Sequence, residues 1–85
     1  MDELRKKIDD VDARIIKLLA RRLRFSKRIG NMKKEQSLAI KDGERETSLL
    51  HKVCELAAAE GLDKSYVEEI YKLILKESRS RQEIP

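Results

Sequence analysis

The N-terminal part of the chain carries apolar residues at helical spacing with little to interrupt them. One row repeats every seven residues and comprises Leu4, Val11, Leu18, Phe25 and Met32. A second row is offset by four and comprises Ile8, Ile15 and Ile29. Two rows at this offset form the stripe by which one helix packs on others. Because neither proline nor glycine precedes Gly30, the sequence predicts one helix over residues 2–35, in which Gly30 costs up to about 1 kcal/mol relative to alanine.

The length of this helix constrains the architecture. About 33 residues at 1.5 Å per residue give a rod of roughly 50 Å. A compact domain of 85 residues has a radius of gyration of about 12 Å, and hence a diameter of about 30 Å. The rod therefore extends beyond what the rest of the chain can cover, yet its apolar stripe runs along its whole length. A second copy of the chain is the simplest cover, and we expect a homodimer with the long helices paired.

Two shorter helices are expected in the remainder of the chain. Asp42 is a suitable N-cap for a helix over residues 43–60, which Gly61 ends. Asp63 can cap a third helix over residues 63–82. No segment alternates apolar and polar residues as a half-buried strand does. The sequence thus predicts an all-α fold of three helices, one long and two of medium length.

Composition excludes several classes of protein. The single Cys54 rules out an intrachain disulfide framework, and His51 as the only histidine leaves too few ligands for a structural zinc site. The first residues, Met1 to Arg5, lack the apolar core expected of a signal peptide, and no apolar run is long enough to span a bilayer. We therefore expect one cytoplasmic domain over residues 1–85. The 20 Lys and Arg residues exceed the 16 acids by 4, so the expected partner is either a polyanion or a small acidic ligand.

Arg22 interrupts the second apolar row between Ile15 and Ile29, where an aliphatic side chain belongs. A buried guanidinium without a counter-charge is very costly. Arg22 therefore reaches water at the helix edge, pairs with a carboxylate such as Glu46, or binds an anionic ligand. Lys33 lies eleven residues further on, which leaves only about 20° of rotation and about 16 Å along the axis. The two cations thus point the same way and can converge on one ligand.

The other two helices also replace core-facing apolar positions by polar ones. In the third helix the line of Ile74 continues as Ser78 and Gln82, and in the second helix Glu46 precedes Leu50 by one turn. Each substitution alone is typical of a solvated helix end. Together with the cations of the first helix, they favour a polar pocket shared by the three helices.

Arg5 needs separate treatment because it lies seventeen residues before Arg22 on the same helix. That separation corresponds to about 25 Å, which is too far for both side chains to hold one small ligand. Arg5 is therefore either solvated, or contributed to such a site by the antiparallel partner chain of a dimer.

The chain resembles the all-helical chorismate mutases of the AroQ class over nearly its full length. The matching segments are 4–9, 11–12, 18–22, 29–33 and 42–46, followed by Ser78 and Gln82. The Asp-x-x-Arg-Glu motif at 42–46 would be weak alone, because charged runs of this kind are common. Combined with Arg22, Lys33 and the Ser-x-x-x-Gln ending, it is specific.

The resemblance implies an intertwined helical-bundle homodimer with two active sites, each completed by Arg5 of the other chain. It also implies an isomerase that converts chorismate to prephenate by a Claisen-type [3,3] rearrangement, in the phenylalanine and tyrosine branches of the shikimate pathway. Such an enzyme uses no cofactor and no metal. Its partners would be the dicarboxylate chorismate and a second copy of the chain, without nucleic acid or membrane.

The resemblance further assigns roles around the reacting bonds. Arg5 and Arg22 bind the two carboxylates of the substrate, assisted by Ser78. Lys33 bridges a carboxylate and the ether oxygen, to which Gln82 also donates. Because negative charge grows on that oxygen as its bond breaks, a cation and an amide placed there stabilise the transition state. Lys33, Gln82 and Arg22 are thus the expected catalytic residues.

By the same resemblance, Glu46 and the backbone at Asp42 hold the ring hydroxyl of the substrate, while Arg45 supports the charged network. Arg79 is a departure, since the family usually has an apolar residue at this position near the ligand. An added cation there either helps to hold a dianion or perturbs the pocket.

Three other interpretations stay open from the sequence. Isochorismate–pyruvate lyases use the same scaffold and a similar cationic pocket, although the motif at 42–46 with Ser78 and Gln82 favours the mutase. A non-catalytic basic helical module would bind polyanions with a steep salt dependence, but it leaves Arg22 unexplained. The third interpretation is a family member that folds but has lost its activity. The sequence gives no positive sign of such a loss, because every mapped site residue is present.

Overall fold

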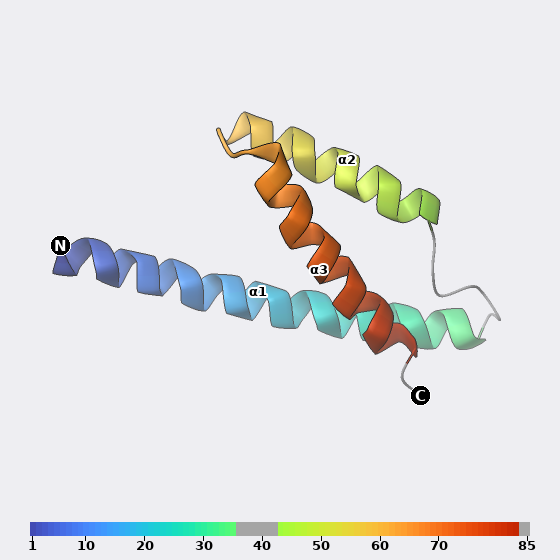
Figure 1. Cartoon of the computed structure of the whole chain (residues 1–85). Helices are drawn as coiled ribbons and strands as arrows, with labels where there is room; N and C mark the ends of the chain where they lie inside the picture. Colours follow the sequence, from blue (N-terminus) through green and yellow to red (C-terminus); the bar gives the residue numbers. More distant parts are fainter. Residues whose placement is uncertain (36–42, 84–85) are drawn as a thin grey trace.

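The computed structural model describes residues 1–35 and 43–83, which form three α-helices (Figure 1). They are α1 at Asp2–Glu35, α2 at Gly43–Ala59 and α3 at Lys64–Glu83. No strand occurs among the described residues. The predicted all-α fold with three helices is therefore confirmed, and each helix begins and ends within one residue of its predicted position.

The turn between α2 and α3 follows from two local signals. Gly61 adopts the left-handed region with a φ of 73°, and the amide of Leu62 donates to the carbonyl of Ala57 at 2.8 Å. These are the features by which a glycine C-cap closes a helix. The Oδ1 atom of Asp63 then accepts from the amide of Ser65 at 2.9 Å, so Asp63 caps α3 as predicted.

Helix α3 holds the fold together because it packs against both other helices, whereas α1 and α2 do not pack on each other over the described residues. In Figure 1, α3 starts beside the end of α2 and crosses the C-terminal half of α1. The apolar core is small: among the described residues, the buried apolar side chains are Val53, Ala57 and Leu75. The position of α3 thus determines where α1 and α2 lie.

The face of α1 that packs on α3 is not its apolar stripe. The buried residues of α1 are Ser26 and Gly30, and their small side chains let α3 approach closely. The apolar rows lie on the surface of the single chain, where Leu4 is 63%, Ile8 58% and Ile29 46% exposed. The stripe predicted to pack on other helices therefore remains uncovered within one chain.

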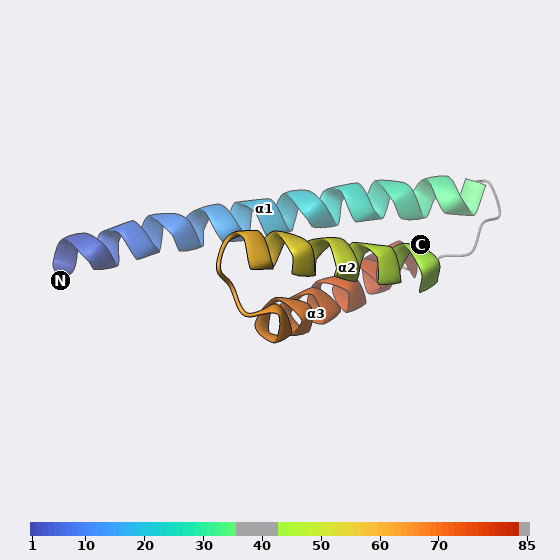
Figure 2. The same cartoon turned by 90° about the horizontal axis from the view of Figure 1, so that it is seen from above.

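The molecule is elongated. Its extents are 52 × 24 × 15 Å and its radius of gyration is 15.5 Å, against about 12 Å for a compact domain of this length. The N-terminal half of α1 projects past the other two helices in both views (Figures 1 and 2). None of the helices in the described part of the chain combines the length and the apolar character needed to cross a membrane.

Candidate active site

A cleft of about 350 Å³ lies between the C-terminal half of α1, the first turns of α2 and the C-terminal part of α3. Because α1 and α2 do not pack on each other, α3 forms the floor of the cleft and the other two helices form its walls. The apolar part of the lining consists of Phe25, Ile29, Leu49 and Leu75. The volume is in the range of sites that hold a small organic ligand.

Six of the eight predicted site residues line this cleft. They are Arg22 and Lys33 from α1, Arg45 and Glu46 from α2, and Ser78 and Gln82 from α3. Asp42 lies outside the described residues. Arg5 is exposed on the N-terminal part of α1 and does not line the cleft of its own chain. The pocket expected from three separate helix faces is thus present, and Arg5 is separated from it as the helix length predicts.

Arg22 contacts α3, the floor of the cleft, where its Nη1 donates to the Oγ of Ser78 at 2.6 Å. Ser78 is buried and also accepts from the Oγ of Ser26 at 3.1 Å. A serine hydroxyl accepts two hydrogen bonds and donates one, so Ser78 can still offer its own proton to a ligand oxygen. The alternative in which Arg22 pairs with Glu46 is wrong, because the partner of Arg22 is Ser78.

Gln82 sits against Gly30 where α3 crosses α1. A Cβ on Gly30 would lie 2.7 Å from the Cα of Gln82 and 2.9 Å from its Cβ. Side chains do not approach that closely, so glycine is the residue that allows this crossing. The Oε1 of Gln82 is buried without a hydrogen-bond partner among the described residues. A buried unpaired oxygen requires an explanation, and an amide that serves a ligand supplies one.

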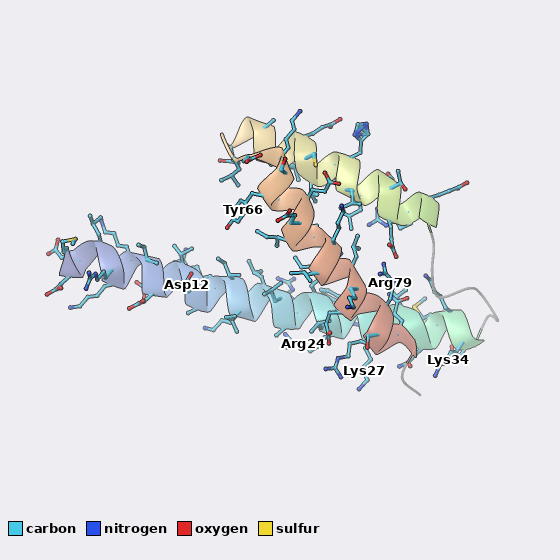
Figure 3. All side chains as sticks on the ribbon, in the orientation of Figure 1. Asp12, Arg24, Lys27, Lys34, Tyr66 and Arg79 are labelled. Atoms are coloured by element: carbon cyan, nitrogen blue, oxygen red, sulfur yellow. The ribbon has the colours of Figure 1, made fainter. Side chains whose placement is uncertain are left out.

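Glu46 pairs with Arg79 at the edge between α2 and α3. The Nη1 of Arg79 lies 2.6 Å from the Oε1 of Glu46, and the two side chains are 29% and 21% exposed. Arg79 lines the cleft, and it points from α3 toward the side on which α2 begins (Figure 3). The cation that the resemblance marks as a departure therefore lies on the lining of the cleft.

Ser26 is a cleft residue that the sequence reasoning missed. It lies four residues after Arg22 and four before Gly30, so the three share one face of α1. That spacing was the available signal. A face made of arginine, serine and glycine has no apolar signature, and the apolar row that contains Leu18 and Phe25 dominates the pattern instead.

The charges on the cleft favour an anionic ligand. Four cations line its described part, namely Arg22, Lys33, Arg45 and Arg79, and Glu46 is the acid among the described lining residues. An excess of positive charge on the walls of a cleft concentrates and holds small anions. Within residues 1–35 and 43–83, no group of three or more His, Cys, Asp or Glu residues could hold a metal ion.

The chain is similar in sequence to known proteins. The family model for chorismate mutase type II matches residues 4–83. A chorismate mutase of Methanocaldococcus jannaschii is 29% identical over 80 residues, which is 94% of this chain and 81% of that protein. A bifunctional chorismate mutase/prephenate dehydratase of Buchnera aphidicola is 36% identical over 78 residues, which is 92% of this chain and 20% of that protein. A bifunctional chorismate mutase/prephenate dehydratase of Aquifex aeolicus is 41% identical over 56 residues, which is 66% of this chain and 16% of that protein.

The coverage differs between these relatives. The chain spans about a fifth of the Buchnera aphidicola protein but 81% of the Methanocaldococcus jannaschii protein. The family match takes in almost all of the chain, including the six predicted residues that line the cleft. The chain therefore belongs to the chorismate mutase type II family.

Proposed function

We propose that the protein is a chorismate mutase, an isomerase that rearranges chorismate to prephenate in the biosynthesis of phenylalanine and tyrosine. The observation that carries the proposal is the cleft, where polar residues from three helices meet around an excess of positive charge. The rearrangement takes place within one molecule and needs no nucleophile or proton transfer. The protein then has to bind and orient the substrate and to stabilise the charge of the transition state. The proposal therefore includes no cofactor. We also propose that the enzyme is cytoplasmic.

Binding the two carboxylates of chorismate is the first task. Arg22 is held in place by its 2.6 Å hydrogen bond to Ser78, which supports a role for both residues at one carboxylate. A charged, planar guanidinium suits a carboxylate because it donates two parallel hydrogen bonds. Fixing both carboxylates also holds the enolpyruvyl arm over the ring, which brings the reacting carbons together.

Stabilising the ether oxygen is the second task. Its bond to the ring breaks ahead of the new carbon–carbon bond, so negative charge grows on this oxygen in the transition state. Lys33 and Gln82 are the groups proposed to donate to it, and both line the cleft. Because the negative charge on this oxygen is larger in the transition state, the two donors stabilise the transition state more than the ground state. Removing one such donor typically lowers the rate by about 10²–10³-fold.

The ring hydroxyl is the third feature to be recognised. Glu46, with the backbone at Asp42, is proposed to hold it, and Arg45 to support the charged network. A carboxylate accepts hydrogen bonds and repels the carboxylates of the substrate, so a hydroxyl donor is the part of chorismate that suits Glu46.

We also propose that the enzyme is an intertwined homodimer, in which Arg5 of one chain completes the cleft of the other. The exposed apolar stripe of α1 supports this, since Leu4 and Ile8 are 63% and 58% exposed in the single chain. So does the small core, because a chain of 85 residues needs more apolar burial to offset its conformational entropy. Arg5, about 25 Å from Arg22 along α1, then serves the opposite site.

The direct test is to mix the purified protein with chorismate and follow the loss of the ultraviolet absorbance of chorismate. We expect acceleration over buffer, and little activity in an Arg22→Ala variant. A parallel assay with isochorismate distinguishes the lyase, which would release pyruvate. If the wild-type protein leaves chorismate unchanged, the proposal is wrong.

A further inference from the structure

The ion pair between Arg79 and Glu46 joins α3 to the first turns of α2 at the cleft. Its 2.6 Å distance and the partial burial of both side chains set it apart from the ion pairs of the outer surface. Arg81 and Glu77, for comparison, lie 2.8 Å apart on one helix, with side chains 52% and 49% exposed. Exposed pairs of that kind contribute little, whereas a pair on the lining can influence a ligand.

Glu46 is an unusual group in a cleft otherwise rich in cations. Its carboxylate accepts hydrogen bonds but repels other carboxylates, so within a bound dianion it suits a hydroxyl. A glutamate side chain has several rotatable bonds and must be ordered before it can hold a hydroxyl in one place. The contact with Arg79 uses Oε1, and this orders the side chain while leaving Oε2 for a ligand.

We propose that Arg79 is a positioning residue that fixes the Glu46 carboxylate and thereby determines recognition of the ring hydroxyl. Arg79 acts through Glu46 and need not touch the substrate. This inference rests on the proposed chorismate mutase function. It assigns a role to a cation of the cleft that the proposed function leaves without one.

Two other roles for Arg79 lead to different results. If Arg79 binds a carboxylate of the substrate directly, its loss weakens every ligand that carries that carboxylate. If the pair only clamps α2 to α3, its loss lowers thermal stability and weakens all ligands of the cleft together. Positioning of Glu46 concerns the hydroxyl alone, so only ligands that carry the hydroxyl should respond.

The experiment uses two ligands and three variants of the full chain. The ligands are chorismate and the chorismate analogue in which hydrogen replaces the ring hydroxyl, which keeps the reacting atoms and is followed as a second substrate. The variants are Arg79→Met, which removes the charge at similar length, Arg79→Lys, which retains it, and Arg81→Met. Arg81 is the matched control because it lies on the same helix and does not line the cleft.

For Arg79→Met we expect the KM for chorismate to rise about tenfold with kcat little changed, because the hydroxyl contact is equal in the ground and transition states. The KM for the analogue should stay at the wild-type value. Arg79→Lys should recover most of the loss, since an ammonium can still hold the carboxylate. Arg81→Met should match the wild type in every measurement.

Equal weakening of chorismate and the analogue by Arg79→Met would overturn the inference, and so would an unchanged KM. Failure of Arg79→Lys to recover the KM would also overturn it, and this variant keeps the test valid if Arg79→Met folds poorly. If the wild-type protein does not turn over chorismate, the proposed function and this inference are both wrong. An active wild type with an unaffected Arg79→Met variant would remove the inference alone.

Discussion

Gly30 of α1 and Gln82 of α3 face each other so closely that a methyl group on Gly30 would lie 2.7 Å from the Cα of Gln82. The obstacle is backbone and not the end of a flexible side chain, so relief would require α3 itself to move. Gln82 also lines the cleft. The closeness of this helix crossing therefore sets how far the Gln82 amide enters the site.

Gly30→Ala should lower both stability and activity. Alanine favours a helix over glycine by up to about 1 kcal/mol, but forcing a methyl group into filled space typically costs about 1–3 kcal/mol. Because the neighbouring atom is backbone, we expect the cost of the added methyl group to exceed the gain in helix preference, and we expect Gln82 to shift. Urea unfolding at fixed protein concentration and the kcat of chorismate turnover measure the two losses.

Gly43→Ala is the matched control for this prediction. A Cβ on Gly43 would meet no atom of the described residues within 4 Å, so the variant should be as stable as the wild type or slightly more stable. Equal stability and activity of the Gly30→Ala variant and the wild type would contradict the close crossing.

Gln82→Ala should reduce kcat by about 10²–10³-fold, the usual effect of losing one preorganised donor to a developing oxyanion. Gln82→Glu provides a sharper test, because a carboxyl group donates a hydrogen bond only when protonated and repels the ether oxygen when ionised. An unperturbed glutamate has a pKa of about 4.3, so the activity of this variant should rise as the pH falls.

The wild-type kcat should change little across neutral pH, because the Gln82 amide does not ionise. Rate profiles of both proteins from acidic to neutral pH check the two expectations together. A Gln82→Glu variant whose kcat does not increase toward acidic pH would show that residue 82 does not donate to the ether oxygen.

Mixing an Arg5→Ala variant with an Arg22→Ala variant tests the shared site. Each variant alone should be nearly inactive. In a dimer that contains one chain of each kind, one site has both arginines intact and the other has neither. After random exchange, half of the dimers are mixed, so activity should return to about a quarter of the wild-type value.

Subunit exchange in that mixture is verified by mass spectrometry of differently tagged chains. If the mixed dimers form and activity stays at the level of the separate variants, Arg5 does not serve the site of its partner.

Ile8→Glu should weaken the dimer and, with it, the fold. Ile8 belongs to the exposed apolar stripe, and burying a carboxylate against a second stripe is strongly unfavourable. We expect a smaller species in analytical ultracentrifugation, with loss of helix by circular dichroism. Lys6→Glu is the control, because two residues at 100° each place Lys6 on the face of α1 opposite Leu4. It should sediment as the wild type does.

The helices are the part of the fold that the sequence determined by itself. Gly61 and Asp63 act on backbone groups within a few residues, so the end of α2 and the start of α3 could be located from local chemistry. The 3.6-residue period likewise places Arg22 and Lys33 on one face of α1 without knowledge of any other helix. Most of the cleft followed from such alignments, one helix at a time.

Only the tertiary structure decided which side chains meet across helices. Arg22 bonds to Ser78, 56 residues away, and Arg79 pairs with Glu46 at a separation of 33 residues. Long cationic side chains reach many acceptors, so their partners depend on how α3 crosses its neighbours. That crossing depends in turn on the close approach of α3 at Gly30. A packing contact of this kind leaves no periodic pattern in the sequence, because it exists only once the helices are assembled.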